Sequence, residues 1–353
     1  MPRKKIEANP DVVFLVAQLF FEGLSMREIA RKVNSQMKLA KPLNRESVYP
    51  LLAEARRLNL VRLLAPIEQK LATEIAGRFG FDERQITVVR TQGRHFNEFV
   101  AAEAAEVALR LLREVASSSP KGWVGLGLGP GRATLDFSRY LGPLLQSAIN
   151  VPPLKLFAIC AGSPARSPEY SSTSFFNLFP AQLVKERIGL FAETVVPCSD
   201  FEKIKKRPGV AEAFAARDGI DIVVTSMGDF YDEDDLLSTF LKQAGTDLED
   251  RRRKGWIGSV QYRPFSASGP IEERSEDMRA VTLFELDDFA RLAQTKHRHV
   301  LLIARQCGHC GKTRAAALRP VLEAPRLRLW SELVMDEATA RELLQAPGSR
   351  HAR

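Results

Sequence analysis

The sequence predicts an α/β protein in which a mostly parallel, Rossmann-like sheet follows a small N-terminal helical unit. Three observations lead to this prediction. Short, continuously apolar runs alternate with helical segments through most of the chain, which is typical of a parallel sheet covered on both faces. A glycine-rich segment joins one of these runs to a helix. Finally, the first 64 residues are much more basic than the rest.

The composition is that of an ordinary soluble protein with room for two domains. The chain has 353 residues, of which 45% are hydrophobic and 27% charged, close to globular averages. No apolar run approaches the ~20 residues that span a bilayer, and the basic start leads into no signal-peptide core. Four scattered cysteines, Cys160, Cys198, Cys307 and Cys310, do not form a disulfide framework. We therefore expect a cytoplasmic protein that does not bind membranes.

The positive charge is concentrated in the first 64 residues. They hold 12 Lys and Arg against 6 Asp and Glu, a surplus of 6 in a chain whose net charge is +8. A small basic unit attached to a nearly neutral body favours binding to a polyanion. A solubilising surface is the alternative.

Residues 1–64 also have the pattern of a helix-turn-helix unit. An amphipathic helix is expected over 11–22, and a second begins after Ser25, which forms a capping box with Glu28. A third, over 45–58, is capped by Asn44 and would be the recognition helix. A long connection at 35–43 and a proline inside the third helix leave a winged-helix or dimerisation module as alternatives. The candidate DNA-binding residues are Arg27, Arg45, Ser47, Tyr49, Arg56 and Arg57.

A domain boundary is expected near Pro66, so the chain divides into a head at 1–64, a body at 65–345 and a disordered tail at 346–353. Within the body, the longest helix is expected over 96–116. The expected strands lie at 86–89, 122–126, 154–159, 220–225, 299–304 and 328–334. Ligands of such sheets bind beyond the carboxyl ends of the strands.

The glycine-rich segment is the main candidate for anion binding. Glycines occur at every second position from Gly125 to Gly131, and a helical run begins at Arg132. A helix start reached through glycines presents backbone N–H groups to a phosphate. The segment matches neither a Walker loop nor G-x-G-x-x-G. A sharp turn between strand and helix is the alternative interpretation.

Further polar loops follow other expected strands. A hydroxyl-rich loop occupies 160–174, and Gly311 and Lys312 are expected to open a helix after the strand at 299–304. Cys307 and Cys310 form a single C-x₂-C pair, which could bind a metal, act as a redox pair or be incidental. No catalytic motif appears, so we expect a protein that is not an enzyme and needs no cofactor.

Over nearly its whole length the chain resembles the SorC family of bacterial sugar-binding transcriptional regulators. LFFEGLSMREIARKV resembles the start of the family's helix-turn-helix, and LLAEARRLNLVRL its recognition helix and wing-like strand. WVGLGLGPGRAT takes the place of its phosphate-binding glycine loop. The most specific match is VMDEATARELL, which is similar to the family's final strand and helix.

This resemblance implies a DNA-binding head and an effector domain related to ribose-5-phosphate isomerase and glucosamine-6-phosphate deaminase. It also implies operator DNA and a phosphorylated sugar as partners, in a homo-oligomer (dimer or tetramer). The residues implied to bind phosphate are Gly129, Gly131, Arg132, Ala133, Thr134, Arg279 and Lys312. Asp336 and Glu337 are implied to line or brace the sugar pocket. Because a phosphate loop binds any phosphate, we expect discrimination between sugars to come from the loop at 160–174, with Ser172 and Thr173, and from Gln261 or Asp336.

Two other functions stay open. The fold would also serve a sugar-phosphate isomerase or deaminase, with Asp229 or Glu337 as the only plausible base. Alternatively, the chain could be a regulator whose sugar pocket has decayed and which responds to another partner.

Overall fold

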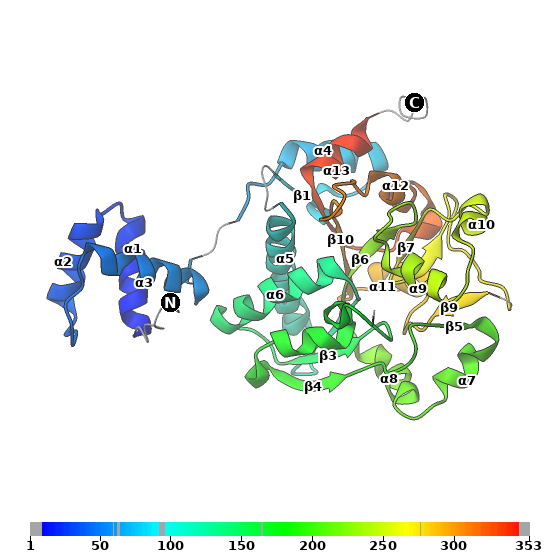
Figure 1. Cartoon of the computed structure of the whole chain (residues 1–353), viewed down its shortest axis with the longest axis horizontal. Coiled ribbons are helices and arrows are strands. Elements are labelled where there is room, and N and C mark those ends of the chain that lie inside the picture. Colours follow the sequence, from blue (N-terminus) through cyan, green and yellow to red (C-terminus); the bar gives the residue numbers. More distant parts are fainter. Residues whose placement is uncertain are drawn as a thin grey trace. The chain divides into compact units, whose positions relative to one another are not determined.

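The computed structural model describes residues 9–58, 60–61, 64–91, 96–163, 165–275 and 277–345. The chain divides into two compact units, Met1–Leu64 and Ala65–Arg353 (Figure 1). The predicted tail at 346–353 lies outside the described residues. In the part of the chain that is described, no helix is long and apolar enough to cross a membrane.

The small unit consists of helices packed around an apolar core of their own. Its described helices are α1 (Pro10–Phe21), α2 (Met26–Gln36) and α3 (Arg45–Arg57). The predicted caps are confirmed. Ser25 and Glu28 form the capping box of α2, and the Asn44 side chain accepts a hydrogen bond from the Ser47 amide at the start of α3.

The long connection between α2 and α3 is fastened by one side chain. Asn34 Nδ2 donates to the Leu43 carbonyl at 2.9 Å, and Asn34 Oδ1 accepts from the Leu43 amide at 2.8 Å. This pair of hydrogen bonds closes the connection just before α3 begins. Helix α3 continues through Pro50, which needs no i−4 acceptor because it has no N–H group.

The large unit is built on a parallel sheet. Its strands follow the order β1-β11-β10-β6-β2-β3-β4, with every neighbouring pair parallel. Their bounds are β1 Ile86–Val89, β2 Val124–Leu128, β3 Leu154–Ala158, β4 Val184–Ile188, β6 Ile222–Asp229, β10 His299–Ala304 and β11 Glu332–Asp336. The predicted fold class is confirmed.

Two smaller antiparallel elements accompany this sheet, and one of them extends it. The hairpin of β7 (Gly258–Val260) and β8 (Arg263–Phe265) pairs with the carboxyl end of β6. Strands β5 (Val195–Pro197) and β9 (Met278–Ala280) form a separate antiparallel pair. The hairpin brings residues 258–265 next to the end of a central strand.

Helices cover both faces of the sheet, and Figure 1 shows α5 and α6 together on one side of the central strands. The larger helices are α4 Gln69–Phe79, α5 Phe96–Ser118, α6 Arg132–Ser147, α11 Leu286–Gln294, α12 Ala315–Glu323 and α13 Glu337–Leu344. The shorter ones are α7 Phe201–Lys205, α8 Val210–Ala216, α9 Leu236–Gln243 and α10 Leu248–Arg253. The 3-10 turns are η1 Glu83–Gln85, η2 Pro168–Tyr170, η3 Ser172–Leu178, η4 Ala181–Leu183, η5 Cys198–Asp200, η6 Arg217–Gly219 and η7 Pro325–Leu327.

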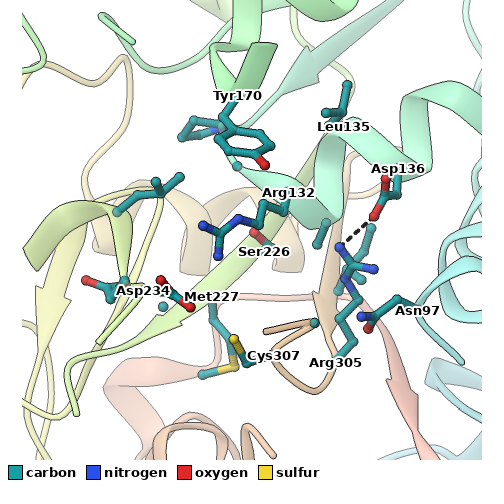
Figure 2. Close-up of a pocket in the computed structure, with 18 of the residues that line it drawn as sticks. Asn97, Arg132, Leu135, Asp136, Tyr170, Ser226, Met227, Asp234, Arg305 and Cys307 are labelled. Atoms are coloured by element: carbon teal, nitrogen blue, oxygen red, sulfur yellow. Dashed lines mark hydrogen bonds and ion pairs between the residues drawn. The ribbon is translucent and has the colours of Figure 1, made fainter. Parts of the chain in front are cut away.

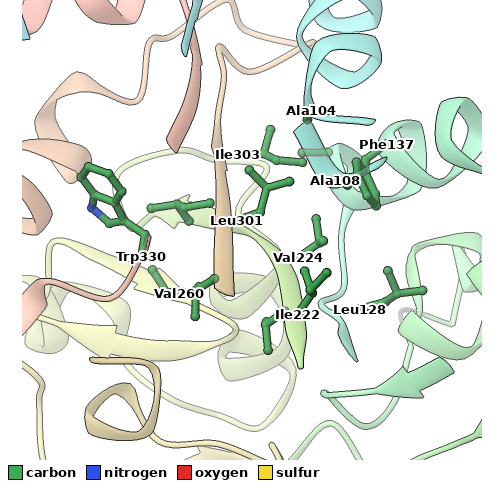
Figure 3. Packing of buried hydrophobic residues seen from close by; sticks show 14 of the residues in the cluster. Ala104, Ala108, Leu128, Phe137, Ile222, Val224, Val260, Leu301, Ile303 and Trp330 are labelled. Atoms are coloured by element: carbon green, nitrogen blue, oxygen red, sulfur yellow. The ribbon is translucent and has the colours of Figure 1, made fainter. Parts of the chain in front are cut away.

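Small side chains on α5 allow close packing of this layer. Ala104 and Ala108 are fully buried and lie next to Ile303 of β10 and Phe137 of α6 (Figure 3). An alanine-lined helix can approach a sheet closely, and β-branched residues on the strands then fill the interface. The core therefore fixes the position of α6, whose first turn borders the site described below.

The alternating glycines of 125–131 have two structural roles, close packing within β2 and a turn into α6. Gly125 and Gly127 lie within β2, where a Cβ on Gly125 would collide with the carbonyl of Gly219. These glycines allow close packing against the sheet, so they are not part of a loop. Only Gly131 has the positive φ, +105°, that favours glycine at the turn into α6.

Several element limits differ from the prediction. The last strand is Glu332–Asp336, not 328–334, because 325–327 forms a 3-10 turn. Strand β6 continues to Asp229 because the β7–β8 hairpin pairs with its end. The helix expected at Gly311 and Lys312 begins at Ala315, so a loop of irregular backbone follows β10.

Candidate functional site

A pocket of about 490 Å³ lies at the carboxyl ends of β2, β6 and β10. In the sheet, β3 and β4 lie on one side of β2, whereas β6, β10 and β11 lie on its other side, so the strand order changes direction at β2. A crevice where the strand order changes direction is the usual ligand site of such sheets. Its lining includes Asn97, Gly131, Arg132, Asp136, Tyr170, Ser226, Asp234, Asp235, Gln261, Arg305, Cys307 and Arg314.

The first turn of α6 forms one wall. Gly131 is the N-cap of α6, and its amide donates to the Tyr170 carbonyl at 2.9 Å. No described side chain caps this helix, so its first N–H groups and the positive end of its dipole face the pocket. The Arg132 guanidinium lies 5.3 Å from the centre of the Tyr170 ring, on the side of Asp234 (Figure 2).

Two arginines also line the pocket, and one of them, Arg305, is bonded to Asp136 on α6. Arg305 Nη2 donates to Asp136 Oδ2 at 2.8 Å, and Arg314 Nη2 donates to Asp232 Oδ2 at 2.8 Å. The Nη1 atom of each arginine is buried and has no partner among the described residues. Burial lowers the pKa of Arg305, which nevertheless remains charged because an arginine pKa starts so high. The pocket is thus lined by two guanidinium groups that are oriented by carboxylates and whose Nη1 atoms have no acceptor in the part of the chain that is described.

Uncharged polar side chains also line the pocket, and Asn97 lies beside Arg305 (Figure 2). Gln261 Oε1 and Asn97 Oδ1 are buried without a partner in the described part of the chain. Gln261 and Tyr262 have positive φ, 54° and 60°, as in the tight turns that join β-hairpins, and Gln261 Nε2 donates to the Ile159 carbonyl. A buried acceptor without a partner is costly, and a hydroxyl group of a ligand would satisfy it.

A buried carboxyl lies at the start of α9. Asp235 accepts from the Ser238 amide and hydroxyl, both at 2.8 Å. Burial raises the pKa of Asp235 to about 6, against the effect of the Ser238 hydrogen bonds and of Arg314. The neighbouring Asp229 raises it further. Asp235 therefore ionises in the folded protein well above its ordinary range.

This shift predicts a pH dependence of stability. Between about pH 4 and pH 6 the unfolded chain ionises Asp235 while the folded chain keeps it protonated. The folded state is therefore stabilised in full below about pH 4, and this stabilisation is lost as the pH rises through about 6. At 1.36 kcal/mol per pKa unit, the loss is about 3 kcal/mol. We expect the unfolding free energy of wild type to fall by this amount relative to Asp235→Asn. Urea denaturation followed by tryptophan fluorescence would measure it, because all three tryptophans lie in the large unit. Parallel pH profiles would contradict the assignment.

Four of the predicted effector-binding residues line the pocket, namely Gly131, Arg132, Ala133 and Gln261. Asp336 lies behind it, where it caps α13 and accepts the amide of Gln306 at 2.8 Å.

The structure places the other predicted effector-binding residues outside the lining. Gly129 packs against Thr225, and the Thr134 hydroxyl points to the Pro130 carbonyl at 3.5 Å. Lys312 Nζ donates to the Tyr231 carbonyl at 3.1 Å.

Arg279 lies in a different part of the unit. It pairs with Glu285 at 2.5 Å, and its guanidinium lies 3.7 Å from the centre of the Phe201 ring. Glu337 pairs with Arg341. Ser172 is buried in η3, and Thr173 shares a hydrogen bond with Ser171 at 2.8 Å.

Several residues that line the pocket were not among the predicted site residues, above all Asn97, Asp136, Tyr170, Arg305 and Arg314. Arg305 could have been predicted from the sequence, because it directly follows the apolar strand 299–304, and ligands bind at the carboxyl ends of such strands. Tyr170 lies in the hydroxyl-rich loop that the sequence singled out. Asp136, on α6, carried no signal.

The candidate DNA-binding residues fall into two groups on the small unit. Arg27 and Arg45, at the starts of α2 and α3, border one shallow hollow together with Phe20. Arg56 and Arg57 lie at the end of α3, where Arg57 Nε donates to Glu54 at 2.7 Å. The Ser47 hydroxyl is engaged in the cap of α3, and Tyr49 is half exposed.

Solved structures of bacterial transcription regulators share this fold. The full-length sorbitol operon regulator SorC from Klebsiella pneumoniae is similar with a TM-score of 0.61 at 18% identity, over 96% of this chain and 100% of that one. A DeoR family transcriptional regulator from Listeria monocytogenes is similar with a TM-score of 0.56 at 18% identity, over 78% of this chain and 98% of that one. A candidate sugar-binding domain of a transcriptional repressor from Vibrio fischeri is similar with a TM-score of 0.54 at 14% identity, over 78% of this chain and 97% of that one.

These similarities concern the fold. No family model matches the chain, and no curated protein sequence matches it. The resemblance to SorC regulators is thus confirmed at the level of architecture, for the large unit and, through the full-length protein, for nearly the whole chain.

Proposed function

We propose that the chain is a DNA-binding transcriptional regulator of the SorC type that responds to a phosphorylated sugar. In this proposal residues 1–64 form a helix-turn-helix domain that binds operator DNA of a carbohydrate-utilisation operon. Residues 65–345 bind the effector in the pocket between β2, β6 and β10. The protein acts in the cytoplasm as a homo-oligomer, a dimer or a tetramer.

The observation that carries the proposal is that Arg305 and Arg314, each with a buried Nη1 atom that lacks a partner among the described residues, line the same pocket as the uncapped start of α6. Charged donors left without acceptors cost stability, and a phosphate supplies several acceptor oxygens at once. Backbone N–H groups at a helix start add to its binding. Gln261 and Asn97, which also line the pocket, offer acceptors suited to sugar hydroxyl groups.

The rival functions receive less support. Asp229 and Glu337, the bases proposed for an isomerase, both lie outside the pocket lining. Asp229 accepts from the Tyr231 amide at 2.9 Å, and Glu337 pairs with Arg341. A decayed pocket would be expected to be filled by side chains, whereas this one has a volume of about 490 Å³ and a polar lining.

A thermal-shift screen tests the proposal directly. Phosphorylated sugars should stabilise the large unit, and their unphosphorylated parents should not. A ligand at 100 times its dissociation constant adds about 2.7 kcal/mol, which raises the midpoint by roughly 5 °C in a unit of this size. Equal shifts with free and phosphorylated sugars would contradict phosphate binding, and the absence of any shift across pentose and hexose phosphates would contradict the effector assignment.

A further inference from the structure

The loop that follows β10 and Asp232, which follows β6, bring together two sulfur atoms and a carboxylate oxygen to which the proposed function assigns no ligand. The Cys307 and Cys310 sulfur atoms and a carboxylate oxygen of Asp232 all lie within 4.8 Å of one another. Cys310 Sγ lies 3.6 Å from Asp232 Oδ1. Ligand atoms around a tetrahedral zinc ion lie roughly 3.5 Å apart, as Zn–S bonds of about 2.3 Å and Zn–O bonds of about 2.1 Å require.

The backbone between the two cysteines is folded into a tight turn. The Cys307 amide donates to the Lys312 carbonyl at 2.8 Å, and the Gly311 amide donates to the Cys307 carbonyl at 3.0 Å. Gly311 takes a positive φ of +70° directly after the second cysteine. This turn holds both sulfur atoms on the same side of the loop, as a two-cysteine half of a metal site requires.

Asp232 is oriented by a second residue. Its Oδ2 accepts from Arg314 Nη2 at 2.8 Å. Its Oδ1 accepts from the Asp234 amide at 3.1 Å and lies 3.6 Å from Cys310 Sγ. A ligand carboxylate held by an outer hydrogen bond is a regular feature of metal sites. Two thiolates and one carboxylate around a divalent ion leave one negative charge, which Arg314 neutralises.

A thiol-exchange role fits this arrangement less well. A redox-active pair needs an exposed sulfur with a lowered pKa. Here Cys307 is buried, and the sulfur of the exposed Cys310 lies next to a carboxylate, 3.6 Å from Asp232 Oδ1, where a cation would be needed to activate it. Metal binding, by contrast, removes the thiol protons as the ion binds.

We propose that Cys307, Cys310 and Asp232 bind one zinc ion, or a similar thiophilic divalent cation, at the edge of the pocket. Three protein ligands leave the fourth position open for water or for an oxygen of a bound molecule. Cys307 and Arg314 also line the pocket, so the ion would fix the loop that carries them. The metal site does not depend on what the pocket binds.

The test uses the reduced full-length chain, freed of metal by a chelator and titrated with Zn²⁺ and with Co²⁺. We expect one ion per chain, and with Co²⁺ the sulfur-to-metal charge-transfer absorption and the visible bands of a tetrahedral site. Cys310→Ala, a change at an exposed position, should weaken binding at least tenfold and remove much of the charge-transfer band. Asp232→Asn should weaken binding while the sulfur-to-metal band remains.

Cys198→Ser is the matched control, because Cys198 is partly exposed and lies outside the cluster. It should bind the metal like wild type. Circular dichroism and the thermal midpoint of each variant show whether it folds. Binding without a charge-transfer band, or unchanged binding in Cys310→Ala, would overturn the proposal. A Cys307–Cys310 disulfide that forms reversibly in protein unable to bind metal would overturn it in favour of a redox pair.

Discussion

Arg305→Ala should weaken binding of a phosphorylated sugar by about 10- to 100-fold. The buried Nη1 of Arg305 has no acceptor among the described residues, and a hydrogen bond from a charged donor contributes about 1.5–3 kcal/mol. The substitution also leaves the Asp136 carboxylate at the pocket wall, where it would repel the phosphate. Calorimetric titration with the best sugar phosphate from the thermal-shift screen would measure the change.

The effect should not arise from misfolding. Asp136 is partly exposed and keeps a second partner, Arg139, at 3.3 Å when Arg305 is removed. Arg291→Ala, which removes an exposed arginine paired with Asp288 on the surface, should bind like wild type. Arg305→Lys should give an intermediate affinity because a lysine keeps the charge but not the planar fork. Wild-type affinity in Arg305→Ala would place the phosphate elsewhere.

The sequence was sufficient to predict the architecture, but the limits predicted within the glycine segment were wrong. The strand was expected to end at residue 126, whereas β2 continues to Leu128. Alternating apolar runs and helices predict the parallel sheet because that pattern is local. Whether a glycine lies in a strand or in a loop depends on what packs against it. Gly125 faces the backbone of Gly219, nearly a hundred residues away in the sequence, and no local pattern reveals that contact. Gly131 could be predicted correctly because the helix start at Arg132 is visible beside it.

The pocket was harder to predict because its charged pairs are distant in the sequence. Arg305 and Asp136 are separated by 169 positions, and Arg314 and Asp232 by 82. The predicted strand ends indicate where a ligand binds. They do not indicate which basic side chains line the pocket. Arg279, which the resemblance implied for phosphate binding, lies outside the lining of this pocket and pairs with Glu285. Its role as a ligand of the effector stays a prediction.

The second large effect is expected on DNA binding. Arg45 and Arg56 lie near the two ends of α3, and both are exposed. If each contacts a phosphate, Arg45→Ala/Arg56→Ala should weaken binding at least tenfold at moderate salt. The plot of log K against log salt should also become less steep by about 1.8, since each contact contributes about 0.9. Fluorescence anisotropy on a duplex selected by wild type from a random pool would measure both quantities.

The control for this experiment must remove the same charge from a different surface. Lys203→Ala/Arg291→Ala takes two exposed cations from the large unit and lowers the net charge equally. If α3 contacts DNA, this control should keep the wild-type slope, because counterion release depends on which cations meet phosphates. Equal slopes in both double variants would show that net charge alone attracts the duplex. The assignment of residues 1–64 as the operator-binding domain would then fail, whatever the pocket binds.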